Sequence, residues 1–264
     1  MSRPDMQIDA GRWRNRLLAL GGLIAVIALS WLYLVRTNAG MSHGHGGMDQ
    51  MAMPAMALRL PEQLLAAFVM WSVMMVAMML PTALPAVTVF ANLARRRGLQ
   101  TDSASPTALF VAGYVAAWTG YSVVAAVGQV ALSRAALLTP MLQSASIALS
   151  AVILLGAGAF QFTSLKDACL AKCRMPLAYF LAEWRDGKAG ALVLGLKHGS
   201  YCVGCCWALM AVMFVVGAMN LLWMGALTLF VLGEKLAPAR WQFRHVAGAA
   251  LVLWGLAVAT SLVR

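Results

Sequence analysis

Seven long apolar stretches dominate this chain of 264 residues and restrict what it can fold into. They cover residues 17–35, 64–90, 107–132, 144–162, 189–216, 220–236 and 246–263. Most reach the ~20 residues that an α-helix needs to cross about 30 Å of hydrocarbon. Apolar residues make up 62% of the chain and charged residues 11%, so polar side chains cannot cover the apolar surface in water. The sequence therefore predicts an all-α, polytopic transmembrane helical bundle of about seven spans.

Positive charge is divided unevenly between the segments that connect these stretches. With a cytoplasmic N-terminus, fifteen Lys and Arg residues fall in cytoplasmic segments, four fall in outer segments, and Lys197 lies within a span. Cytoplasmic loops are enriched in Lys and Arg, so this division predicts a cytoplasmic N-terminus and a periplasmic C-terminus. A nucleic-acid binder would instead cluster its positive charge on one soluble face, so we expect no nucleic-acid partner despite the net charge of +11.

The apolar stretches divide the chain into three regions. Residues 1–36 are expected to form a cytoplasmic segment and an uncleaved membrane anchor, because a 19-residue apolar stretch exceeds the ~7–15 residues of a signal peptide. Residues 37–63 are expected to form a flexible periplasmic loop, and residues 64–264 a six-span metal-binding core. The loop contains soft candidate metal ligands, namely Met41, His43, His45, Met48, Met51, Met53 and Met56.

A short run of Cys and His residues in the fifth stretch is the most distinctive motif. On a helix, His198, Cys202 and Cys206 share one face, and Cys205 borders that face. Thiolate and imidazole ligands suit Cu(I) or zinc. Cysteine is also an ordinary apolar residue in membrane helices, but ionisable groups at this depth are costly and usually functional. We interpret the motif as a soft-metal or redox site.

Two further pairs of sulfur-bearing residues recur at helical spacing. Met74 and Met78 lie on one face of the second stretch, where their thioethers would suit Cu(I) or serve only for packing. Cys169 and Cys173 are expected near the cytoplasmic face, on a helical extension of the fourth stretch. They would form a metal relay, a redox pair, or part of an interfacial segment without metal.

The same segments resemble the DUF2182 family of predicted metal-binding integral membrane proteins of bacteria. The resemblance covers roughly residues 64–262, and the residues that carry it are 74–81, 166–176, 198–210, 219–224 and the pair Glu234-Lys235. It implies a metal-binding membrane protein and no established reaction. At the end of the sixth stretch, we expect Glu234 and Lys235 to form an interfacial ion pair of little energetic weight.

Together these patterns indicate a bacterial inner-membrane protein that binds a soft metal, Cu(I) ahead of zinc, for copper transport, delivery or homeostasis. Its partners would be the lipid bilayer, the metal ion, and a periplasmic metal carrier or other membrane subunits. The sequence contains no P-loop, which argues against ATP-driven pumping by this chain. Two alternatives remain open: a membrane thiol-disulfide oxidoreductase, and a non-catalytic scaffold subunit of a membrane complex. Only the first of these would make the chain an enzyme.

The predicted orientation can be tested with a reporter that is active only in the periplasm. We expect activity when the reporter is fused after Arg264 and none when it is fused after Arg97, because positive charge keeps the Arg97 segment in the cytoplasm. The reverse pattern would contradict the orientation and would place the Met- and His-rich loop in the cytoplasm.

Overall fold

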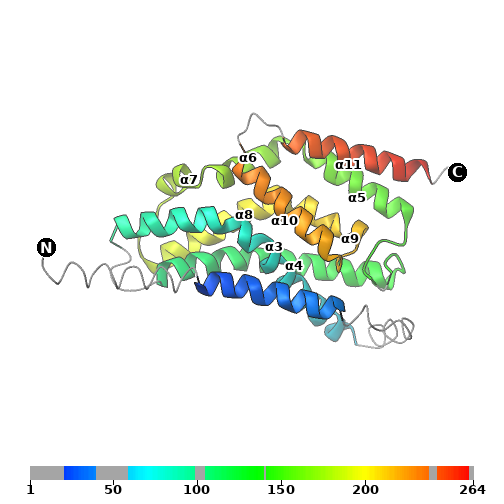
Figure 1. Cartoon of the computed structure of the whole chain (residues 1–264), viewed down its shortest axis with the longest axis horizontal. Helices are drawn as coiled ribbons and strands as arrows, with labels where there is room; N and C mark the ends of the chain where they lie inside the picture. Colours follow the sequence, from blue (N-terminus) through cyan, green and yellow to red (C-terminus); the bar gives the residue numbers. More distant parts are fainter. Residues whose placement is uncertain (1–20, 40–58, 99–104, 140, 238–242, 262–264) are drawn as a thin grey trace, which may run out of the picture.

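The described part of the chain is helical, as the sequence predicts. The structure is a computed structural model, and it describes residues 21–39, 59–98, 105–139, 141–237 and 243–261. The helices are Gly21–Ala39, α3 (Leu60–Arg96), α4 (Ser105–Arg134), α5 (Ile147–Phe160), α6 (Ser164–Arg174), α7 (Pro176–Ala182), α8 (Gly187–Ala211), α9 (Met213–Val216), α10 (Leu221–Leu236) and α11 (Phe243–Thr260) (Figure 1). Within these ranges there is no β-strand, only one isolated bridge between Leu138 and Ser144.

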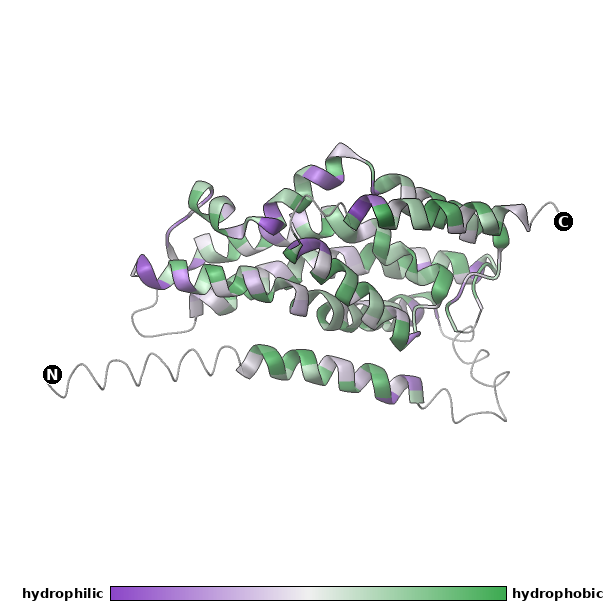
Figure 2. Cartoon of the chain, turned by 45° about the horizontal axis from the view of Figure 1, so that its top comes forward, coloured by the Kyte–Doolittle hydropathy of each residue, from purple (hydrophilic) through white to green (hydrophobic). Residues whose placement is uncertain are grey.

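Five of the described helices are long and apolar enough to cross a membrane. They are Gly21–Ala39, α3, α4, α8 extended through α9, and α11. Hydrophobic residues cover most of their length, and hydrophilic residues gather chiefly near helix ends (Figure 2). A sixth span results if α5 and α6 are counted together, although they are bent by 64° relative to one another. The predicted count of seven also needs α10, whose 16 residues rise only about 24 Å, so that count stays a prediction.

The centre of the bundle depends on close contact between the backbones of α4 and α8, which run side by side (Figure 1). A Cβ atom added at Gly195 would lie 2.0 Å from the carbonyl oxygen of Phe110, and one at Gly199 would lie 2.8 Å from that of Tyr114. From the α4 side, a Cβ at Gly113 would lie 2.2 Å from the carbonyl oxygen of Leu192. Small residues at such spacing let membrane helices pack backbone against backbone. This packing holds the middle of α8 rigidly inside the bundle.

The Gly21–Ala39 helix and α11 lie on opposite sides of this centre (Figure 1). In each of the two, only 11% of the most apolar window is buried inside the protein, as expected for helices that face lipid. The Gly21–Ala39 helix contacts α3 where a proline leaves a backbone carbonyl of α3 without its helical hydrogen bond. Pro81 has no backbone N–H, which leaves the carbonyl of Ala77 without its helical donor, and the indole nitrogen of Trp31 donates to that carbonyl at 3.0 Å.

Most of the predicted Met- and His-rich loop lies outside the described residues. This applies to His43, His45, Met48, Met51 and Met53, whose role as ligands therefore stays a prediction. The division of the chain into residues 1–36, 37–63 and 64–264 likewise stays a prediction.

The contact between α4 and α8 predicts that Gly195→Ala destabilises the protein. Because the added methyl group would meet backbone rather than a flexible side chain, we expect a loss of about 1–3 kcal/mol, seen as a lower midpoint of thermal unfolding in detergent. Gly120→Ala is the matched control, since a Cβ at Gly120 in α4 has no neighbour within 4 Å. Equal midpoints for both variants would show that the close contact contributes nothing to stability.

Candidate metal centre

Three cysteines from two helices meet in the interior of the bundle. Cys173 is close to the end of α6, and Cys202 and Cys205 lie in the middle of α8. The three sulfur atoms all lie within 4.8 Å of one another, and all three residues are buried. The bend between α5 and α6 makes this possible, because it lays α6 against α8. The sequence motif contained Cys202 and Cys205, but nothing in the sequence placed Cys173 beside them.

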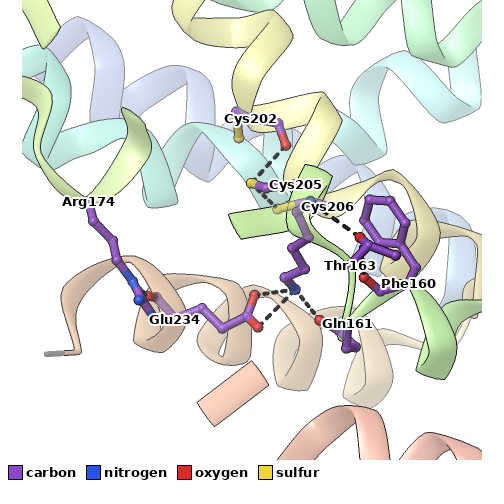
Figure 3. Close-up of polar contacts among 9 residues, drawn as sticks. Phe160, Gln161, Thr163, Arg174, Cys202, Cys205, Cys206 and Glu234 are labelled. Carbon is purple, nitrogen blue, oxygen red and sulfur yellow. Dashed lines mark hydrogen bonds and ion pairs between the residues drawn. The ribbon is translucent and has the colours of Figure 1, made fainter. Parts of the chain in front are cut away.

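The other two cysteines border this group of three sulfur atoms, which we call the thiol centre. The sulfur of Cys206 lies 3.2 Å from that of Cys205, and the Cys205 thiol donates to the carbonyl oxygen of Cys202 at 3.2 Å (Figure 3). Cys169, one turn before Cys173, packs against Gly204, where an added Cβ would lie 2.8 Å from the Cys169 sulfur. All five cysteines are free thiols. Five sulfur atoms thus gather along one contact between α6 and α8.

A lysine and a tyrosine contact Cys202 directly. The ammonium group of Lys235 lies 3.1 Å from the Cys202 sulfur and donates to the Thr82 hydroxyl at 2.7 Å. The hydroxyl of Tyr114 lies 3.1 Å from the same sulfur and donates to the carbonyl of Met79 at 3.1 Å. Lys235 is 7% exposed, so its charge needs a partner nearby. A thiolate at Cys202 would supply that partner.

The expected interfacial ion pair between Glu234 and Lys235 is wrong. Both residues are buried, and as neighbours on a helix they point to different partners. The ammonium group of Lys166, itself fully buried, lies 2.9 Å from each carboxylate oxygen of Glu234. Lys166 also donates to Gln161, and Arg174 donates to the Glu234 carbonyl at 2.7 Å (Figure 3). The end of α10 is therefore held to α6 by Glu234 and to α8 and α3 by Lys235.

His198 lies one helical turn before Cys202, outside the thiol centre. Its ring is 2% exposed and lies between four aromatic rings, those of Phe110, Tyr114, Tyr179 and Phe180, with centroid separations of 5.6 to 6.1 Å. Its Nδ1 atom has no hydrogen-bond partner within the described ranges. His198 is not one of the three residues whose ligand atoms lie within 4.8 Å of one another, and its role as a ligand stays a prediction.

Lys197 is the cation that the sequence places inside a span. Its ammonium group reaches back to Glu183, at the end of α7, and lies 2.5 Å from a carboxylate oxygen. Both side chains are more than one third exposed, as expected when a lysine extends its stem toward water. The hydrogen bond from Lys197 lowers the pKa of the Glu183 carboxyl below its ordinary value.

Met74 and Met78 are both buried in α3. Their helix also contains the Met79 carbonyl, which accepts from Tyr114, and the Thr82 hydroxyl, which accepts from Lys235. Tyr114 and Lys235 in turn contact Cys202. This places α3 at the wall of the site. Whether their thioethers bind metal stays a prediction.

The thiol centre fits a soft metal ion. A metal about 2.3 Å from each sulfur would need sulfur atoms about 4.0 Å apart in a trigonal site and at most about 4.6 Å apart in any site. Separations within 4.8 Å meet this requirement after movements of less than about 1 Å. No carboxylate joins the group within the described residues, so the donor set is sulfur alone. Such a set selects Cu(I) or zinc over hard cations.

One comparison with known proteins gave a match. A family model with the description "PpoB2: Copper chaperone" matches residues 68–258, which include α4 to α10, most of α3 and α11, and all five cysteines. No curated protein and no solved structure matches the chain. The predicted resemblance to the DUF2182 family covered nearly the same residues, and a copper-related family agrees with its implied metal binding. The DUF2182 name itself stays a prediction.

The buried pair of Lys166 and Glu234 predicts strong coupling between these residues. Lys166→Met leaves a buried carboxylate without a partner, so we expect a loss of about 3–5 kcal/mol in thermal unfolding. The double variant Lys166→Met/Glu234→Leu should recover most of this loss, because it removes both charges. The coupling would be contradicted if the loss of stability in the double variant equalled the sum of the losses in the two single variants.

Proposed function

The chain belongs to the PpoB2 copper chaperone family, and from this premise we propose that it holds Cu(I) at Cys173, Cys202 and Cys205 and passes it to another protein. Copper is the cargo in this proposal. The observation that carries it is the meeting of three buried thiols from α6 and α8, with sulfur as the sole donor type. The apolar helices support a membrane location, and we assign the bacterial inner membrane.

Charge balance supports Cu(I) as the cargo. The site lies in an apolar interior, where an uncompensated charge is costly. Two thiolates with Cu(I) carry a net charge of −1, and the ammonium group of Lys235 beside Cys202 would neutralise it. Zinc would need a third thiolate for the same balance. Charge balance is therefore compatible with a Cu(I) site of two thiolates and one neutral thiol, and the family match favours copper over zinc.

The arrangement of the remaining cysteines supports delivery rather than permanent storage. Soft ions move between proteins by exchange of one ligand at a time, which needs further sulfur atoms within reach. The sulfur of Cys206 lies 3.2 Å from that of Cys205, and Cys169 lies on the neighbouring turn of α6. A scaffold subunit would not need five buried free thiols along one helix contact.

The same sulfur atoms also favour a second candidate, thiol oxidation. Two thiols would form a disulfide by giving two electrons and two protons to a membrane quinone, which would leave as quinol. The supporting observation is again the proximity of the sulfur atoms of Cys173, Cys202 and Cys205. The two functions differ in what protects the thiols from alkylation, which is Cu(I) in the first and a reversible disulfide in the second.

Cys202→Ser tests the copper site. Serine is close in size but lacks the soft thiolate, so we expect copper per folded protein to fall by at least about tenfold after anaerobic loading with Cu(I). Cys169→Ser is the matched control, because Cys169 is also buried but lies outside the thiol centre, and it should retain copper within about twofold. Copper is measured by elemental analysis of the monodisperse protein in mild detergent.

Lys235→Met is the second arm of this experiment. It keeps an apolar stem of similar length and removes the charge beside Cys202, so copper affinity should fall while the fold remains. Equal copper content in the wild type and in the Cys202 and Lys235 variants would reject the thiol centre as the copper site. No copper in any of them, together with a disulfide that forms reversibly, would favour the oxidoreductase.

A further inference from the structure

A cleft of about 480 Å³ lies at the end of the bundle where the Gly21–Ala39 helix ends and α10 begins. Its lining residues include two methionines, Met141 and Met219, and three residues with amide side chains, Asn38, Gln143 and Asn220. The other lining residues are apolar, and none of the described residues that line the cleft is charged. The cleft is therefore a neutral site in which sulfur is the softest donor.

Two turns with unusual backbone conformations form the walls of this cleft. Leu142, between two lining residues, has a φ of 56°, and Gly217 has a φ of 94°. A positive φ in a residue with a branched side chain such as Leu142 is costly, and such strain concentrates at functional sites. Hydrogen bonds connect these segments. The backbone N–H of Ala218 donates to the Leu142 carbonyl at 3.5 Å, and the Asn38 side chain donates to the Met219 carbonyl at 2.5 Å.

We propose that this cleft is an acceptor site for Cu(I), bound by the thioethers of Met141 and Met219 before it reaches the thiol centre. The inference rests on the proposed function, since it assigns the place where the cargo is received. A thioether is neutral and needs no deprotonation, so it binds Cu(I) reversibly, and the bound ion keeps its single positive charge. Met141 is 43% exposed, so solvent can stabilise that charge. The volume exceeds what one ion needs and leaves room for the ligands of a donor molecule during exchange.

Buried methionines lie between the cleft and the thiol centre. Cys206 and Val216, which lines the cleft, are ten residues apart along α8 and α9, which corresponds to roughly 15 Å. Met210 and Met213 occupy positions between them, and both are fully buried. Along the chain, two buried thioethers therefore lie between the cleft and the thiols of α8. Binding strength would increase along this path, from neutral thioethers to charged thiolates.

Oxidation of single methionines measures binding at the cleft directly. Silver(I) serves as a soft monovalent probe that does not change oxidation state under these conditions. The protein carries Cys173→Ser, Cys202→Ser and Cys205→Ser, so that the thiol centre cannot contribute. Hydrogen peroxide converts exposed Met to the sulfoxide, which mass spectrometry assigns to each residue. We expect Ag(I) to slow oxidation of Met141 and Met219 by about fivefold or more, because the bound sulfur lone pair is not available.

Met175 is the internal control, since it is 61% exposed and lies between α6 and α7, away from the cleft. Its oxidation should be unchanged by Ag(I). Equal slowing at all three residues, or no slowing at Met141 and Met219, would overturn the acceptor site. Either result leaves the copper content of the Cys202→Ser experiment unaffected, so failure of this inference is distinguishable from failure of the proposed function.

The double variant Met141→Leu/Met219→Leu in the wild-type background tests the order of events. With a Cu(I)-chelator complex as donor, we expect the thiol centre to load at least about tenfold more slowly but to reach the same final copper content. Met175→Leu should load at the wild-type rate. An unchanged rate in the double variant would show that copper reaches the thiols by another route.

Discussion

The cost of placing charge in an apolar interior governs the arrangement of this protein. Lys166, Glu234 and Lys235 are all buried, and each has a partner of complementary character. Lys166 and Glu234 neutralise one another across α6 and α10, which leaves Lys235 without a carboxylate. The group that contacts its ammonium is the sulfur of Cys202. A charged ammonium at Lys235 would need a thiolate at Cys202, and this contact links the packing of the helices to the chemistry of the cysteines.

The position of α6 connects the fold to the site. Cys169 and Cys173 lie on α6, which follows α5 after a bend of 64°. This bend lays α6 against α8, and the pair of Lys166 and Glu234 helps to hold it there. The contact of α4 with Gly195 and Gly199 fixes the other side of α8. Cys202 and Cys205 are therefore held between a rigid backbone contact and a short helix that is secured by charge.

Thioether and thiol sulfur atoms, which differ in how strongly they bind soft metals, occur in two separate parts of the bundle. Met141 and Met219 line a cleft at one end, and Cys173, Cys202 and Cys205 meet in the interior. A chain that receives copper from a donor needs weak ligands where exchange is fast and stronger ligands where the ion is held. The family match to copper chaperones agrees with copper as the ion, and α9 with the end of α8 lies between the two groups of residues along the chain.

The sequence by itself determined the all-α class, the apolar helices and the soft character of the cysteine motif, because each depends on composition and on the spacing of residues along one helix. It also predicted that a metal site would include Cys202 and Cys205. Only the tertiary structure brought Cys173 to them and placed Lys235 on Cys202, since both contacts join residues about 30 positions apart on different helices. It also placed the ring of His198 among four aromatic rings, one turn before Cys202. Helical periodicity predicts which residues share a face, whereas the packing of neighbouring helices decides which of them meet.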